Sequence, residues 1–292
     1  MHTTRPAHCP LANPAHRPAR RAPALPAVPG TLLIPLAARA AGDASFPALA
    51  CGDAEAPRLL DSLGADAGAF LADRPTMLNI LWRTRHIRAA GQAFFTAHPQ
   101  AWGINLGCGL SHYFQWLDNG RNTWVDVDLP EVMALRRTLL PPRGVRLRHA
   151  RLDLCSPRWW HALHLPPRAL EQPVFAVCEG VLMYLPPAQA HAVLEQFAAH
   201  SPPGSRLVID TLTRWAVGHA GLHPSVGRTG AEFLWGVSRM DELASCHPRL
   251  RLERTHSVAE CYGWMGSALE AFWRPWIGAP LYGLAELSVQ DT

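Results

Sequence analysis

The stretch GINLGCGL, residues 103–110, decides the fold, together with the acid that ends the stretch VDVD at residues 125–128. An apolar run that ends in closely spaced glycines is typical of a first strand turning into a helix, and glycine lets the backbone approach a ligand at that turn. Asp128 follows Gly107 by 21 residues. An acid at the end of a second strand can accept hydrogen bonds from both ribose hydroxyls. The pattern therefore predicts an adenosine cofactor at the carboxyl edge of a parallel sheet.

The spacing of the glycines separates two classes of cofactor. A pyrophosphate needs a third glycine at the helix N-terminus, and here the spacing is Gly107-x-Gly109-x-x-His112. This disfavours a nicotinamide-dependent oxidoreductase, although Asp128 keeps that alternative open. S-adenosylmethionine has no phosphate and carries a sulfonium cation, so it tolerates a side chain at this position.

Alternating strands and helices follow on both sides of the glycine turn. Apolar runs of strand length separated by helical patterns indicate a doubly wound, mainly parallel sheet with a Rossmann-like arrangement. The expected strands are 102–106, 123–128, 145–152, 174–178, 206–211, 250–257 and 282–289, seven in all. The expected helices of this part are 111–118, 130–140, 187–200 and 240–246. Residues around Trp264, Trp273 and Trp276 are expected to form an aromatic loop.

The chain divides into a tail, a helical prelude and this core. Residues 1–27 are rich in Pro, Ala and Arg and are predicted to be a disordered extension. Residues 28–292 are predicted to form one domain: a helical cap over 28–100, with helices from Thr31, at 54–63 and at 77–97, and a core over 101–292. A helical and aromatic insert at about 213–240, after the fifth strand, is expected to help form a substrate site. Arg20-Arg21 before an apolar stretch resembles a twin-arginine export signal, but prolines interrupt it, and a cytoplasmic location is expected.

Composition removes several classes of function. The chain has 292 residues and a net charge of +4, but five arginines precede the first acid, Asp43, so the excess lies in the tail and not on a nucleic-acid-binding face. No apolar run approaches the ~20 residues of a membrane span. The seven cysteines form no Cys-x-x-Cys pair. His161 and His164 lack a third ligand at metal spacing, so no metal site is predicted.

Five motifs in order resemble the leucine carboxyl methyltransferase family, and within it a bacterial branch with polyketide O-methyltransferases. The motifs lie at residues 28–40, 83–85, 105–110, 124–132 and 179–185. The resemblance implies S-adenosylmethionine as cofactor and O-methylation of a carboxylate or phenolic hydroxyl on a small, aromatic or polyketide-type acceptor. It also assigns residues 31–40 to the domain and not to a signal peptide.

The resemblance carries roles onto individual residues. Arg83 and Arg39 match basic residues that hold the methionyl carboxylate, Gly107 and Gly109 line the cofactor, and Asp128 takes the ribose hydroxyls. Asp153 matches an acid that binds the adenine amino group, and Leu154 matches an apolar residue that packs on the adenine ring. Glu179 matches a carboxylate near the methionine end of the cofactor. Tyr184, Arg214 and Trp264 are candidates for the acceptor site. No catalytic residue and no oligomeric state are predicted.

One departure from the family pattern stands out. The family usually continues Gly-Leu-Asp-Thr-Arg after the glycine turn, whereas this chain reads Gly-Leu-Ser111-His112-Tyr113. The Asp and the Arg of the family motif are both missing. The chain therefore lacks the local ion pair that these two residues could form, and its turn could differ in shape. A cofactor-binding protein without catalytic activity, acting through association, is therefore the alternative function.

Overall fold

The computed structural model describes residues 30–65 and 68–291 and has a seven-stranded sheet at its centre. The strand order is β3-β2-β1-β4-β5-β7-β6, and β7 is the single antiparallel member because it runs opposite to both β5 and β6. The strands are β1 Trp102–Leu106, β2 Thr123–Asp128, β3 Leu147–Arg151, β4 Phe175–Cys178, β5 Arg206–Leu212, β6 Leu250–Ser257 and β7 Tyr282–Val289. The order reverses between β1 and β4, so a crevice forms at the carboxyl ends of these two strands.

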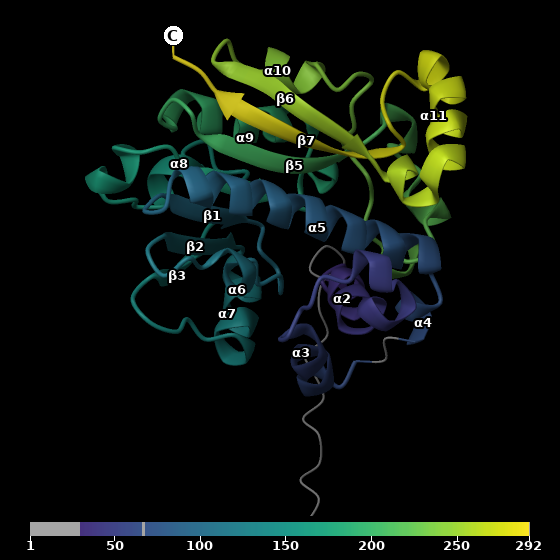
Figure 1. Cartoon of the computed structure of the whole chain (residues 1–292), viewed down its shortest axis with the longest axis horizontal. Helices are drawn as coiled ribbons and strands as arrows, with labels where there is room; N and C mark the ends of the chain where they lie inside the picture. Colours follow the sequence, from purple (N-terminus) through teal and green to yellow (C-terminus); the bar gives the residue numbers. More distant parts are fainter. Residues whose placement is uncertain (1–29, 66–67, 292) are drawn as a thin grey trace, which may run out of the picture.

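Helices cover both faces of the sheet. One face packs against α8 Trp159–Ala162, α9 Pro187–His200 and α10 Glu242–Ser245, with short turns at η2 Pro167–Leu170 and η3 Leu182–Tyr184. The other face packs against the long helix α5 Arg74–Ala97 and the short α6 Phe114–Leu117. Helix α7 Pro130–Leu139 lies on this second face as well, since its Arg136 contacts Asp126 beside Trp124 of β2. Figure 1 shows α5 lying across the sheet from one end to the other. Because β1 and β4 are buried along their whole length, these helices exclude water from both faces.

The N-terminal helices gather at one end of α5. They are α2 Leu33–Ser45, η1 Pro47–Leu49, α3 Ala56–Leu63 and α4 Gly68–Leu71. Asp73 begins α5, and its side chain accepts a hydrogen bond from the backbone N–H of Thr76, which satisfies a free donor of the first turn. Leu36 of α2 and Leu59 of α3 are completely buried in a small cluster that also includes residues of α7. This arrangement places α2 over the carboxyl edge of the sheet.

Most of the predicted elements are confirmed. The strands at 102–106, 123–128, 250–257 and 282–289 and the helix at 187–200 have the predicted bounds. The helix expected at 111–118 shrinks to Phe114–Leu117, because residues 107–113 form the turn itself. The insert at about 213–240 contains three short 3-10 turns, η4 Arg214–Ala216, η5 Ala220–Leu222 and η6 Val226–Thr229. The predicted disordered tail, residues 1–27, lies outside the described residues.

The aromatic loop expected around Trp264 is wrong. After η7 Val258–Tyr262, residues Gly263–Ile277 form helix α11, which stands beside the sheet at one end of the molecule in Figure 1. None of the residues of α11 is buried, and Trp264 is 80% exposed. Glycine, proline and closely spaced tryptophans suggested a loop, but Pro275 lies near the end of the helix, where it leaves the earlier turns intact.

Within residues 30–65 and 68–291, the structure contains no helix with the length and apolar character needed to cross a bilayer.

Gly103→Ala is expected to lower the free energy of unfolding by about 1–3 kcal/mol, because overpacking forces a close-packed core to shift. A methyl group at Gly103 in β1 would lie 1.9 Å from Trp124 Cε3 of the neighbouring strand, and Trp124 is fully buried. Gly221→Ala is the matched control, since a methyl group there would meet no described atom within 4 Å. Urea unfolding of both variants measures the difference, and equal stabilities would contradict this account of the packing.

Candidate functional site

A cavity of about 110 Å³ lies at the carboxyl edge of the sheet, between the glycine turn, α2 and α5. It brings together five of the residues predicted from sequence: Arg83, Gly107, Gly109, Glu179 and Tyr184. These residues come from helix α5, from the turn after β1 and from the segment after β4. The cavity therefore sits at the point where the strand order reverses, as expected for an open α/β sheet.

The glycine turn needs its glycines for conformation and for space. Gly107 and Gly109 have φ values of +65° and +48°, which other residues rarely adopt. A methyl group at Gly107 would lie 2.3 Å from Val181 Cγ2, and one at Gly109 would lie 2.6 Å from Leu32 Cδ2. Leu32 precedes α2, so the N-terminal segment covers the turn. Glycine at both positions thus allows the turn to pack closely between two neighbouring segments.

Asp128 at the end of β2 is fixed by the same turn. Its Oδ2 accepts a hydrogen bond from the backbone N–H of Gly109 and its Oδ1 accepts one from Leu129, both at 2.7 Å. Burial raises the pKa of Asp128 above its usual range, against the effect of these two bonds. Each carboxylate oxygen can accept more than one hydrogen bond, so the group can still bind hydroxyls of a ligand.

The rear of the turn is held by a buried arginine. Arg136 of α7 donates to the carbonyl oxygen of Gly109 at 2.9 Å and to Asp126 Oδ2 at 2.6 Å. Cys108 between the two glycines is also buried, with its Sγ 3.7 Å from Met133 Sδ. The turn is therefore supported from β2 and α7 as well as from β1.

Arg83 is the centre of the polar network on the other side of the cavity. Its Nε donates to Glu179 Oε1 at 2.6 Å, and its Nη1 donates to Asp210 Oδ2 at 3.0 Å and to the Tyr282 hydroxyl at 2.5 Å. The Tyr282 hydroxyl in turn donates to Asp210, and Asp210 Oδ1 accepts from the backbone N–H of Gly180 at 2.7 Å. One guanidinium group thus joins α5 to β5, to β7 and to the segment after β4.

Tyr113, the last residue of the segment that departs from the family pattern, contacts the same network. It is completely buried, and its hydroxyl donates to Glu179 Oε2 at 2.6 Å. Burial alone would raise the pKa of Glu179, but the charges of Arg83 and Arg39 and the hydrogen bond from Tyr113 outweigh it and lower that pKa. His112 lies on another side of the turn, against a separate cavity lined by Glu55 and Gln115, so it does not fill the site.

Arg39 of α2 is buried and only partly satisfied. Its Nε donates to Asp53 Oδ2 at 2.9 Å, while its Nη1 is buried without a hydrogen-bond partner among the described residues. A buried donor without a partner is costly, and such a group is typically satisfied by a ligand or water. Because its charge also lowers the pKa of Glu179, Arg39 belongs to the same polar end of the site.

The remaining predicted residues fall into two groups. Asp153 and Leu154 follow β3 on the same edge as Asp128, since the N–H of Leu152 donates to the carbonyl oxygen of Asp128 at 2.9 Å. Arg214 lines a different cavity, with Trp276, and Trp264 projects from α11, so the structure does not bring these two candidates to the site.

The far end of the cavity is apolar and aromatic. Tyr184 contacts Phe233 with ring centroids 5.8 Å apart, and Phe233 meets His223 edge-on at 6.2 Å. Burial raises the pKa of Tyr184 to about 12, and its hydroxyl makes no hydrogen bond to any described residue. Asn79 of α5 also lines the cavity, and its buried Oδ1 has no partner among the described residues. The uncharged polar groups of Tyr184 and Asn79 therefore lie at the edge of a mostly apolar space.

His223 is the residue of this end that sequence reasoning missed. Its Nδ1 accepts from the backbone N–H groups of Ser225 and Val226 at 3.3 and 3.2 Å, which places the proton of the neutral ring on Nε2. Nε2 lies 3.4 Å from Thr76 Oγ1, and Thr76 in turn donates to Asp73. Burial lowers the pKa of His223, so the ring is neutral at pH 7. A lone histidine in a loop carries no signal in one sequence.

Comparison with known proteins agrees with this geometry. The sequence model for leucine carboxyl methyltransferase matches residues 28–198. The chain is 31% identical over 262 residues to the tetracenomycin polyketide synthesis O-methyltransferase TcmP of Streptomyces glaucescens, covering 88% of this chain and 92% of that protein.

Two solved structures share the fold. A putative methyltransferase from Thermobifida fusca has a TM-score of 0.50 at 19% identity, covering 91% of this chain and 94% of that chain. A DUF574 family protein from Streptomyces avermitilis has a TM-score of 0.52 at 16% identity, covering 78% of this chain and 91% of that chain. Both likenesses concern the fold alone.

Tyr113→Phe is expected to lower the free energy of unfolding by about 1.5–3 kcal/mol at pH 7, because it removes a buried hydrogen bond to a carboxylate. The pKa of Glu179 is lowered in the folded protein. The contribution is therefore complete above the unfolded pKa of Glu179 and is lost as the pH falls through the folded pKa.

Chemical unfolding at pH 7 and in acid measures this difference. Tyr262→Phe is the control, since this side chain is half exposed. A Tyr113→Phe variant as stable as the control at pH 7 would contradict the assignment.

Proposed function

The chain belongs to the leucine carboxyl methyltransferase family, and from this premise we propose that it methylates an oxygen of a small aromatic or polyketide-type acceptor. That it is an S-adenosylmethionine-dependent methyltransferase follows from the family. The nature of the acceptor is the proposed part. We also propose that the reaction takes place in the cytoplasm, without a nucleic acid or a membrane as partner.

The residues of the polar end fit S-adenosylmethionine. When bound, this cofactor supplies a methyl group on a sulfonium leaving group. The unpartnered Nη1 of Arg39 offers donors to the methionyl carboxylate, beside Arg83. The carboxylate of Glu179, whose pKa is lowered, suits the positive charges of the amino and sulfonium groups. Asp128 holds the ribose hydroxyls, and Asp153 and Leu154 read the adenine.

One observation carries the proposal for the acceptor: the aromatic wall of Tyr184, Phe233 and His223 closes the cavity that begins at the glycine turn. Aromatic side chains pack well on planar ligands, and pockets of this kind use a few polar groups to fix orientation. TcmP is named for tetracenomycin polyketide synthesis, which supports a polyketide-type acceptor. The cap at 28–100 and the insert at 213–240 both contribute to this end.

His223 orients the acceptor as a hydrogen-bond donor. Because its Nδ1 is occupied by two backbone N–H groups, its Nε2–H is the donor that remains for the acceptor. This N–H makes a long contact of 3.4 Å with Thr76 Oγ1, which an acceptor oxygen in the cavity would replace. A neutral ring with its proton on Nε2 cannot take a proton at that atom, so it does not act as a general base there. An acceptor oxygen that is already anionic needs no base, which favours a carboxylate or an acidic phenol.

A catalytically inactive binding protein is the second candidate, because of residues 111–113. The charges of Arg83 and Arg39, together with the hydrogen bond from Tyr113, keep the Glu179 carboxylate ionised. The site therefore keeps the charges that methyl transfer needs, which supports an active enzyme.

Asp128→Ala is expected to weaken S-adenosylmethionine binding at least about tenfold, since it removes two hydrogen bonds to the ribose. Isothermal titration with S-adenosylmethionine and S-adenosylhomocysteine measures the affinity, with NAD as the control ligand and Asp241→Asn, an exposed acid, as the control variant. Binding of NAD without S-adenosylmethionine would overturn the choice of cofactor.

His223→Asn is expected to raise KM for the acceptor about tenfold, because it keeps an acceptor for the loop amides and removes the Nε2–H donor. His223→Gln, which restores a donor near the position of Nε2, is expected to recover part of the loss. Both variants are expected to bind S-adenosylmethionine as the wild type does.

Methylation assays with aromatic carboxylic acids and phenols provide the measurement. An unchanged KM in His223→Asn would contradict the role of His223. Cofactor binding without turnover on any of these acceptors would favour the inactive binding protein.

A further inference from the structure

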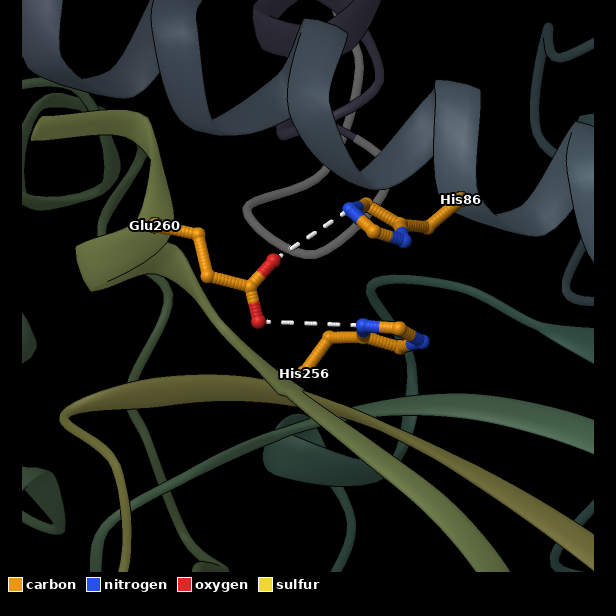
Figure 2. A group of neighbouring side chains, drawn as sticks. All are labelled: His86, His256 and Glu260. Atoms are coloured by element: carbon orange, nitrogen blue, oxygen red, sulfur yellow. Dashed lines mark ion pairs between the residues drawn. The ribbon is translucent and has the colours of Figure 1, made fainter. Parts of the chain in front are cut away.

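Three side chains from two segments that are far apart in the sequence converge outside the cavity described above. They are His86 on α5, His256 on β6 and Glu260 on η7 (Figure 2). His86 Nε2 lies 3.5 Å from Glu260 Oε2, and His256 Nδ1 lies 3.7 Å from Glu260 Oε1. One nitrogen or oxygen atom from each residue lies within 4.8 Å of the other two. The two rings also face each other, with centroids 4.1 Å apart.

The two N···O distances to Glu260 are longer than those of good hydrogen bonds, and they suit a cation shared by the three side chains. Nitrogen and oxygen atoms that bind zinc at about 2.0–2.2 Å with tetrahedral angles lie about 3.3 Å from one another. A direct N–H···O bond would bring donor and acceptor to about 2.9 Å. The three groups therefore face one another across a gap that small movements of side chains would match to a metal ion.

Neighbouring groups orient two of the three side chains. The second nitrogen of His256, Nε2, lies 3.6 Å from Glu286 Oε1 on β7. The indole N–H of Trp82 donates to Glu260 Oε2 at 3.4 Å. Histidines that bind metals usually direct their other ring nitrogen to a carboxylate, and binding carboxylates are themselves hydrogen-bonded. The cluster thus has the supporting contacts of a metal site as well as the three donors.

The pKa values of the two histidines are shifted in opposite directions, and this changes how readily each ring binds a metal. Burial, together with the nearby His256, lowers the pKa of His86, so this ring is neutral and free to bind at pH 7. The Glu286 carboxylate raises the pKa of His256, so a metal has to displace a proton there. Glu260 is exposed, which leaves a side of the cluster open to solvent.

We propose that His86, His256 and Glu260 form a binding site for a divalent transition metal, with Zn²⁺ as the ion that two imidazoles and one carboxylate fit best. The remaining coordination position is open to water. The ion joins α5 to the segment that leads into α11. None of the three residues lines the cavity at the glycine turn, so the site is separate from the methyl-transfer site.

The experiment titrates metal-free full-length protein with Zn²⁺ and measures heat and melting temperature. We expect one tight site and a rise in Tm in the wild type. His86→Ala and Glu260→Gln are expected to weaken this site at least about tenfold, since each removes one of three ligands. The control is the double variant His161→Ala, His164→Ala, which removes an exposed histidine pair. It is expected to bind as the wild type does.

Cobalt spectroscopy gives a readout that does not depend on stability. Co²⁺ bound to the wild type is expected to show the visible absorption of a site with low coordination number, and this absorption is expected to disappear in His86→Ala. Glu286→Gln keeps all three ligands, so it is expected to weaken Zn²⁺ binding without abolishing the cobalt spectrum. The proposal is overturned if the wild type binds no Zn²⁺, or if the control pair loses as much binding as His86→Ala.

Discussion

The buried guanidinium group of Arg83 is the interaction on which the rest of the site depends. It contacts Glu179, Asp210 and Tyr282, which follow or belong to three different strands, while its own backbone lies in α5. Removing one partner of a buried ion pair leaves an uncompensated charge, and such changes are strongly destabilising. The helical cap and the sheet are therefore joined by the same side chain that shapes the polar end of the cavity.

The segment after the glycine turn departs from the family motif, and the structure shows which contacts it makes. A base is missing from residues 111–113, but Tyr113 donates to the Glu179 carboxylate, and Arg136 supports the turn from α7. A tyrosine hydroxyl carries no charge, so Glu179 relies on Arg83 and Arg39 for its electrostatic balance. The positive charge next to Glu179 thus comes from α5 and α2.

The sheet could be predicted from sequence because its strands are short apolar runs between helical patterns, and their order follows the rules for parallel α/β folds. The positions of candidate-site residues within motifs, such as Gly107 and Asp128 at the ends of strands, could be predicted for the same reason. His223, Asp210 and Tyr282 could not, since they join the site only through tertiary contacts with α5. Helix α11 was missed because exposed tryptophans give no amphipathic pattern, and Arg214 and Trp264 were assigned to the site by residue type alone.

Cys108 lies within the turn that borders the methyl-donor site, and its sulfur is directed toward Met133. Burial raises the pKa of its thiol well above the usual range. Only the thiolate is a strong nucleophile, so the buried neutral thiol is unreactive toward alkylating groups. With the cofactor bound as proposed, the Cys108 side chain does not compete with the acceptor for the methyl group.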